Sequence, residues 1–162
     1  EEVAMLFSEA LESGEISLEA LFDQHLTPIA GTNPQQYTTR YLTLTDRLLP
    51  TIQEPMLQLS PLITFCAAVD SKGFLPTHNL KFSQPQRAND PVWNTANSRN
   101  RRIFNDRTGL HAARNQSPFL FQTYRRDMGN DQYVLMKDVS APIVVAGRHW
   151  GALRIGYRFA EA

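Results

Sequence analysis

The apolar positions at the beginning of the chain repeat with the period of an α-helix. Apolar side chains recur three or four residues apart, at Val3, Leu6, Phe7, Ala10 and Leu11. This spacing gives a helix one apolar stripe, and Gly14 follows as a stop signal. An amphipathic helix is therefore predicted over residues 3–11.

Two more helices are predicted before residue 58. Ser17 is a good N-cap for a short helix whose apolar side would be Leu18, Leu21 and Phe22. Asn33 and Pro34 are suited to the cap and first position of a longer helix. Its buried stripe would be Tyr37, Tyr41, Leu44 and Leu48. Pro50 and Pro55 are expected to kink or interrupt this helix.

The pattern changes from helical to extended in residues 61–79. The segment PLITFCAAVDSKGFLPTHN contains an apolar run, an Asp-Ser-Lys-Gly turn and a second short run. This is typical of a β-hairpin in which Gly73 takes a positive φ. The simplest register across the turn places His78 opposite Phe65 and directs Cys66 to the other face. Such a register argues against a Cys-His nucleophile.

Three further strands are predicted near the C-terminus. They run from Phe119 to the Met-Gly-Asn-Asp turn, over residues 132–146 and over residues 149–159. Pro142 cannot donate a ladder hydrogen bond, so it requires an edge position or a bulge.

Residues 80–117 lack a clear period and are rich in Pro and Asn. Short helical pieces are predicted over residues 91–96 and 100–104 within an irregular connection. Long connections of this kind are uncommon in compact domains unless they bind something.

Together these elements predict a single α+β domain with a five-stranded antiparallel sheet. Its parts are N-terminal helices (1–58), a first hairpin (59–79), a pocket insert over one face of the sheet (80–117) and a three-stranded part (118–160). A chain of 162 residues is long enough for one such core.

Composition and charge exclude several classes of function. Sixteen basic and sixteen acidic residues give no net charge, so the domain as a whole does not favour nucleic acid. No apolar run approaches the roughly 18 residues of a transmembrane helix. The single cysteine, Cys66, excludes an internal disulfide, and no two histidines have the spacing of a local metal site.

The insert is the best candidate for a ligand site because it is locally basic. The basic side chains gather in its second half, with Trp93 and Phe104 close by in the sequence: Arg99, Arg101, Arg102, Arg107 and Arg114. We expect one or two of them, Arg99 and Arg102, to bind an anion beside Trp93. The others are expected at the surface or in ion pairs with Asp106 and Asp127.

Two polar residues on the predicted central strands, Tyr124 and Asp138, need partners if they face inward. They could bind a ligand or form a buried network with Arg125 or Arg126, and both readings stay open. His78, near the end of the second strand, is the remaining candidate for the ligand site.

Several of these segments resemble a known family. VDSKGFLPTHN, NRRIFNDRTGL, PFLFQTYRRD and KDVSAPIVVAGRHWGALRIGY together resemble the PAS-like sensor domains of bacterial methyl-accepting chemotaxis proteins, in the single Cache subgroup. The resemblance covers most of residues 35–158. It implies a five-stranded antiparallel sheet with a pocket under the insert. It also implies ligand sensing for a signalling module, without catalysis.

Two alternatives remain. Some members of this subgroup carry a covalent haem, for which the C-x-x-C-H motif is absent here, but non-covalent haem through His78, His111 or His149 stays open. A small hydrolase is the third hypothesis, although no Gly-rich phosphate loop or G-x-S-x-G motif is present.

The resemblance also sets expectations about partners and location. We expect a small-molecule ligand, the signalling domain of the same receptor, and a homodimer formed through the N-terminal helices. The domain would be a soluble part of a membrane-associated receptor. Its lack of transmembrane segments and its end just past the last strand favour the cytoplasmic over the periplasmic side.

Overall fold

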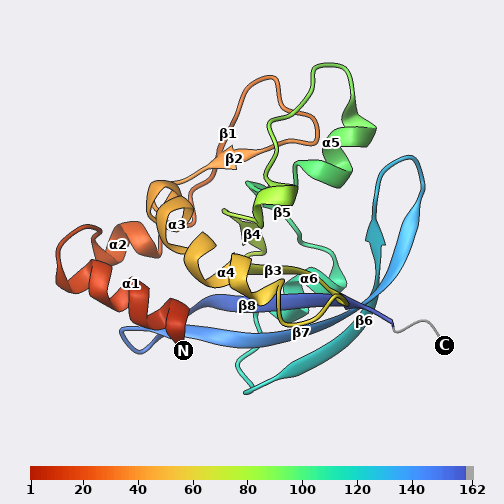
Figure 1. Cartoon of the computed structure of the whole chain (residues 1–162). Coiled ribbons are helices and arrows are strands. Elements are labelled where there is room, and N and C mark those ends of the chain that lie inside the picture. Colours follow the sequence, from red (N-terminus) through yellow and green to blue (C-terminus); the bar gives the residue numbers. More distant parts are fainter. Residues whose placement is uncertain (160–162) are drawn as a thin grey trace.

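Four antiparallel strands form the main sheet of this computed structural model, which describes residues 1–159. Their order across the sheet is β3-β8-β7-β6 (Figure 1). The bounds are β3 (Ile63–Asp70), β6 (Leu120–Asp127), β7 (Tyr133–Val145) and β8 (Arg148–Arg158). The α+β class is confirmed, and the last three strands lie where the alternation of the sequence predicted them.

The fifth strand of the predicted sheet does not form. The short strand β4 (Phe74–Leu75) pairs with β5 (Arg102–Ile103) in a separate two-stranded sheet, instead of with β3. Pro76 follows directly, and its missing N–H prevents the ladder from continuing. The predicted hairpin register was therefore wrong, and His78 lies in the loop beyond β4.

Side-chain amides take the place of the missing strand along the edge of β3. The N–H of Cys66 donates to Asn79 Oδ1 at 2.8 Å, and the N–H of Ala68 donates to Gln53 Oε1 at 2.9 Å. Both amide side chains are fully buried. The edge of β3 thus has its hydrogen bonds satisfied without a paired backbone.

The turn after β3 is built as the sequence predicts. Gly73 has a φ of 87°, a conformation that glycine adopts without strain. Asp70 Oδ1 accepts hydrogen bonds from the N–H groups of Lys72 and Phe74, and its Oδ2 accepts one from the Tyr41 hydroxyl at 2.8 Å. The turn is thereby joined to the N-terminal helices.

Four helices cover one face of the sheet. They are α1 (Glu2–Glu12), α2 (Leu18–Leu21), α3 (Leu42–Leu48) and α4 (Pro50–Met56). Ser17 caps α2 as predicted, with its Oγ accepting from Ala20 N at 3.1 Å. None of the helices within residues 1–159 is long and apolar enough to cross a bilayer.

Trp150 on β8 lies at the centre of this face. Its ring centroid is 5.1 Å from that of Phe7 and 5.6 Å from that of Tyr41, both in edge-to-face geometry. Its Nε1–H donates to the carbonyl of Leu21 at 2.9 Å. One aromatic side chain from the sheet therefore joins α1, α2 and the segment before α3.

The helix predicted to begin at Pro34 begins only at Leu42. Before it lie the two-residue strands β1 (Thr27–Pro28) and β2 (Tyr37–Thr38). The N–H of Tyr37 donates to the carbonyl of Arg101 at 2.8 Å, so this segment pairs with the insert. Pro50 does interrupt the helical stretch, as the first residue of α4.

The C-terminal part of the insert packs on the opposite face of the sheet, against β6, β7 and β8, while α5 (Pro91–Asn97) lies farther from the sheet (Figure 1). The insert also contains the 3₁₀ turn η1 (Leu80–Phe82), β5 and α6 (Arg107–Ala113). The prediction for α5 is confirmed. The helix predicted over residues 100–104 was wrong, since Arg101 has a φ of 61° there and breaks any helix.

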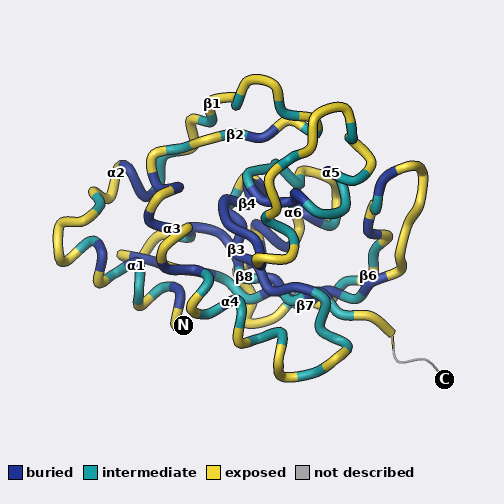
Figure 2. The backbone as a smooth tube through the Cα atoms, turned by 45° about the horizontal axis from the view of Figure 1, so that its top comes forward, coloured by how far each residue is buried: buried dark blue, intermediate teal, exposed yellow. Residues whose placement is uncertain are grey.

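Pro142 lies in a part of β7 that has a neighbour on one side only. The ladder with β6 ends at Ser140, whereas the ladder with β8 continues and shifts register after Ile143. The prediction of an edge position or bulge is confirmed. Figure 2 shows buried residues concentrated where β3 and β8 run side by side, and exposed residues along the loops of the insert.

Candidate functional site

The alternation of the strands places a group of charged and polar side chains on the face under the insert. Tyr124 and Arg126 share this face of β6 because they are two residues apart. Asp138 on β7 and Arg154 on β8 lie on the same face, and the register across the sheet brings these two together. The pocket insert closes over them from the other side.

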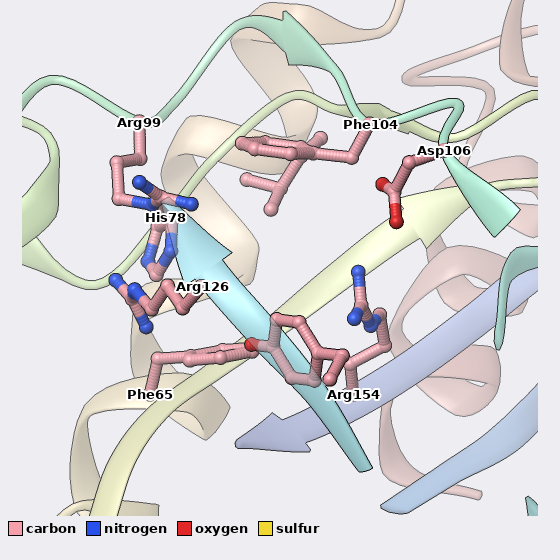
Figure 3. A pocket seen from close by; sticks show the side chains of 9 residues that line it. Phe65, His78, Arg99, Phe104, Asp106, Arg126 and Arg154 are labelled. Carbon is pink, nitrogen blue, oxygen red and sulfur yellow. The ribbon is translucent and has the colours of Figure 1, made fainter. Parts of the chain in front are cut away.

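A small cavity lies between the sheet and the insert, and we call it the inner cavity (Figure 3). Its volume is about 40 Å³. A buried water needs roughly 10–15 Å³ by this measure, so there is room for a few atoms of a small molecule. The lining residues come from both layers of the domain: Phe65, Leu75, His78, Arg99, Phe104, Asp106, Tyr124, Arg126 and Arg154.

A larger groove of about 350 Å³ lies beside the inner cavity, and we call it the outer groove. The two share Arg99, Phe104, Asp106, Tyr124 and Arg126 as lining residues. The outer groove also includes Arg102, from the small strand β5. A ligand could therefore place one end in the inner cavity and extend outward along the groove.

Arg126 is the most unusual group of the site. Its side chain is buried, with 2% relative exposure, and none of its three guanidinium nitrogens makes a hydrogen bond within residues 1–159. The rings of Phe65 and Phe82 contact the guanidinium, with centroids 4.9 and 4.4 Å away. Burial, and then the charge of Arg99, lower the pKa of Arg126 to about 9. A buried cation without a partner costs folding free energy, so its retention calls for an explanation.

Two further arginines add positive charge from the insert. Arg99 is buried and uses one nitrogen to donate to the carbonyls of Thr95 and Asp127, at 2.9 and 2.8 Å. Burial lowers the pKa of Arg99, and burial and Arg99 lower the pKa of Arg102 to about 10. In the described chain, neither arginine has a carboxylate within 4.0 Å.

One acid-base pair lies beneath the cavity. Arg154 Nε donates to Asp138 Oδ2 at 3.0 Å, and both side chains are almost completely buried. Burial raises the pKa of the Asp138 carboxyl, and the guanidinium of Arg154 opposes that shift. The negative charge of Asp138 therefore balances the positive charge of Arg154. The positive charges of Arg99 and Arg126 have no carboxylate of this kind beside them among the described residues.

The remaining polar groups are neutral hydrogen-bond donors. His78 Nδ1 accepts from the N–H of Asn79 at 2.7 Å, so neutral His78 carries its proton on Nε2. Burial, followed by the charge of Arg126 and Arg99, lowers the pKa of His78 well below its usual value. Burial raises the pKa of Tyr124, which keeps the phenol protonated.

Among residues 1–159, the carboxylate that lines the inner cavity is that of Asp106. Asp106 Oδ2 accepts from Gly109 N at 3.4 Å as the N-cap of α6. In Figure 3, Arg99 and Arg126 lie on either side of the His78 ring, while Arg154 points toward Asp106. The site thus offers several donors and an excess of positive charge, which suits a small anion.

The structure brings together most of the residues that the sequence indicated. His78, Arg99 and Tyr124 line the inner cavity, and Arg102 lines the outer groove. Tyr124 is on the edge strand β6, however, and not on a central strand as expected.

The other two predicted residues do not line either space. Asp138 lies beneath Arg154, which is its network partner in place of the predicted Arg125 or Arg126. Trp93 is on α5 and lies against the guanidinium of Arg87, 3.7 Å from its ring centroid. The aromatic wall of the cavity is instead formed by Phe65 and Phe104.

Sequence reasoning missed Arg126 and Arg154 as site residues. The alternation of β6 contained a signal for Arg126, because any inward Tyr124 implies an inward Arg126. The position of Arg154 depends on its cross-strand neighbours Ala67 and Ser140, and hence on the register of β8.

The histidines do not fit a haem. The inner cavity beside His78 is far smaller than a porphyrin ring. His111 is exposed on α6, and His149 is at the β7–β8 hairpin. No group of three or more potential ligands for a metal ion is present in the part of the chain that the structure describes.

Cys66 does not suit a nucleophile. Its side chain is on the face opposite Phe65, and the ring of His78 lies against Phe65 with centroids 5.5 Å apart. The expectation that Cys66 and His78 point to opposite faces is confirmed. Burial, with a contribution from Glu54, raises the pKa of the Cys66 thiol to about 12, so the reactive thiolate is disfavoured at neutral pH.

Comparison with known proteins adds no relative. No family model, no curated protein and no solved structure matches this chain.

Proposed function

We propose that this domain senses a small anionic molecule, which binds in the inner cavity and extends into the outer groove. The observation that carries the proposal is the unpartnered, buried guanidinium of Arg126 beside that cavity. An anion there would pair with Arg126 and Arg99 and accept from His78 Nε2 or the Tyr124 hydroxyl. The folding cost of the buried charge would then be offset on binding.

A binding role is better supported than catalysis. Among the residues that the structure describes, no Ser, Thr or Cys lines the inner cavity as a potential nucleophile. Its histidine is buried and neutral, and its positive groups are arginines, which bind and orient anions. These features agree with a single Cache sensor domain of a chemoreceptor, which the sequence resembles.

Arg99 offers a physical route for transmitting a signal. Its guanidinium joins the carbonyl of Thr95 in α5 to that of Asp127 at the end of β6. An anion that pairs with Arg99 would compete with these contacts and change how the insert is held on the sheet. Binding produces a signal in this way only if the ligand prefers one of the two arrangements.

The expected partners follow from the same proposal. The ligand-bound domain would act on a signalling module of the same receptor, and a homodimer through the N-terminal helices stays a prediction. The apolar stripe of α1, including Val3, Phe7 and Ala10, is buried against its own sheet. A dimer contact would therefore use another side of α1, where Met5 is exposed.

A thermal-shift screen over organic acids, amino acids and purines tests the proposal. Small carboxylates are expected to stabilise the domain, while their neutral amides are not. When the acid is present at 100 times its Kd, the free energy of unfolding rises by ~2.7 kcal/mol, which raises Tm by about 5 °C or more for a chain of this size.

The variant Arg102→Ala should weaken the binding of these acids and keep the fold. Equal shifts from acids and amides, or none from any anion, would contradict the proposal.

A further inference from the structure

A second cavity lies on the other side of Arg126, and we call it the apolar cavity. Its volume is about 250 Å³. It shares only Arg126 with the inner cavity and the outer groove. Its lining comes from the beginnings of β3 and β7, the ends of β6 and β8, the 3₁₀ turn η1 and residues next to these elements: Pro61, Ile63, Thr64, Lys81, Phe82, Arg126, Met128, Val134, Met136 and Arg158.

The walls of this cavity are apolar and adaptable. Ile63, Phe82, Val134 and two methionines, Met128 and Met136, form most of the surface. Val134 stays 40% exposed although it is directly opposite Arg126 across the β6–β7 ladder. Methionine side chains adjust to ligands of different shape. An engineered cavity of about 150 Å³ already binds benzene, so this volume suits a hydrocarbon tail.

Three cations surround the same space. Lys81, Arg126 and Arg158 line it, and no carboxylate does so among the residues described. Glu54, the nearby acid that acts on Lys81, is held by the N–H of Leu80 at 2.8 Å. Burial, followed by the charge of Arg126, lowers the pKa of Lys81, and Arg158 adds to that effect. One anionic head group would relieve the repulsion among the three cations.

We propose that the apolar cavity binds a medium-chain fatty acid, with its carboxylate between Lys81, Arg126 and Arg158 and its tail against Val134 and Met136. A tail of about six to ten carbons matches the available volume. The guanidinium of Arg126 lines both spaces, and its nitrogens, which make no hydrogen bond among the described residues, could pair with an anion in either one. The inference goes beyond the function proposed for the inner cavity, and because both anions would pair with Arg126, we expect the two ligands to compete.

Calorimetric titration with a homologous series of acids tests this site. We expect the affinity to rise about fourfold for each methylene from butyrate to octanoate, because each buried methylene adds a constant increment. Octanol, which has the same tail without the charge, is expected to bind at least about tenfold more weakly. An affinity that is independent of chain length, or equal for octanol, would overturn the proposal.

Two neighbouring tryptophan variants separate this cavity from general apolar binding. Val134→Trp would fill the apolar cavity, so the affinity for the acids should no longer depend on the length of their chains. Leu135→Trp is the matched control, since Leu135 is 52% exposed and points to the opposite face of β7. If the dependence persists in Val134→Trp, or is lost equally in Leu135→Trp, the cavity is not the site.

A charge variant separates this proposal from the function proposed above. Lys81 lines the apolar cavity and neither of the other two spaces. Lys81→Gln is therefore expected to lower octanoate affinity about tenfold and to leave the binding of short acids in the inner cavity unchanged. Unchanged octanoate affinity in Lys81→Gln would contradict the fatty-acid site alone, whereas failure of every short acid would contradict the sensor proposal alone.

Discussion

Arg126→Met is expected to stabilise the domain and to weaken anion binding. Replacing an unpartnered buried charge with an apolar side chain should raise the free energy of unfolding by about 2 kcal/mol. The methionine can occupy the space between Phe65 and Phe82 that the guanidinium fills now. Loss of a charged hydrogen-bonding group should weaken small anions at least about tenfold. Urea denaturation and calorimetry measure the two effects on the same samples.

The neighbouring variant Arg125→Met serves as the control for stability only, because Arg125 also lines the outer groove. Arg125 is exposed, so its replacement should change stability by less than about 0.5 kcal/mol. Destabilisation by Arg126→Met, or anion affinity equal to that of the unmodified domain, would show that Arg126 is a structural group.

The pH dependence of this stability difference follows from the pKa of Arg126. Burial lowers the pKa of Arg126 to about 9 on folding, so between pH 9 and the higher pKa of a solvated arginine the unfolded chain binds more protons than the folded one. Stability therefore rises with pH in this window, and the cost of the buried charge is complete only below pH 9. The free energy of unfolding that Arg126→Met gains over the unmodified domain should be constant near neutral pH and about 1 kcal/mol smaller at pH 10.

Asp138→Asn is expected to be strongly destabilising. The substitution keeps the shape of the side chain but removes the charge that Arg154 pairs with at 3.0 Å. Breaking a buried ion pair by removing one partner costs about 3–5 kcal/mol, because the other charge stays buried and uncompensated. Here the cost should lie at the upper end, since Arg99 and Arg126 already add positive charge nearby. Urea denaturation at neutral pH measures it.

The double variant Asp138→Asn with Arg154→Met distinguishes the pair from simple packing. Removing the second charge should recover most of the lost stability, so the two substitutions are strongly non-additive. Losses that add, or a cost below about 1 kcal/mol for Asp138→Asn alone, would show that the pair is not a structural requirement.

The sequence predicted those parts of the fold that local patterns determine. The alternation of apolar residues located β6, β7 and β8, and Gly73 and Ser17 marked a turn and a cap that both form. The predicted fifth strand does not form, and along that edge of β3 two buried side-chain amides, Gln53 and Asn79, accept the hydrogen bonds instead. Glutamine and asparagine carry no pattern that distinguishes this use from a surface position.

The site was predictable where it depended on one segment and not where it depended on several. The basic insert indicated Arg99 and Arg102, and both line the outer groove, whereas their binding of an anion stays a prediction. Trp93 was misplaced because the orientation of α5 toward Arg87 is set by the tertiary structure. Arg154 was missed because its role depends on the register between β7 and β8.

Arginine side-chain NMR tests the central claim most directly. The Nε–Hε signals of Arg126 and Arg99 can be assigned by their loss in Arg126→Met and Arg99→Lys, and followed while the smallest stabilising acid is added. If an anion binds in the inner cavity, these two signals will shift together along one saturating curve. Shifts confined to exposed arginines such as Arg40 and Arg47, with Arg126 unchanged, would contradict the account.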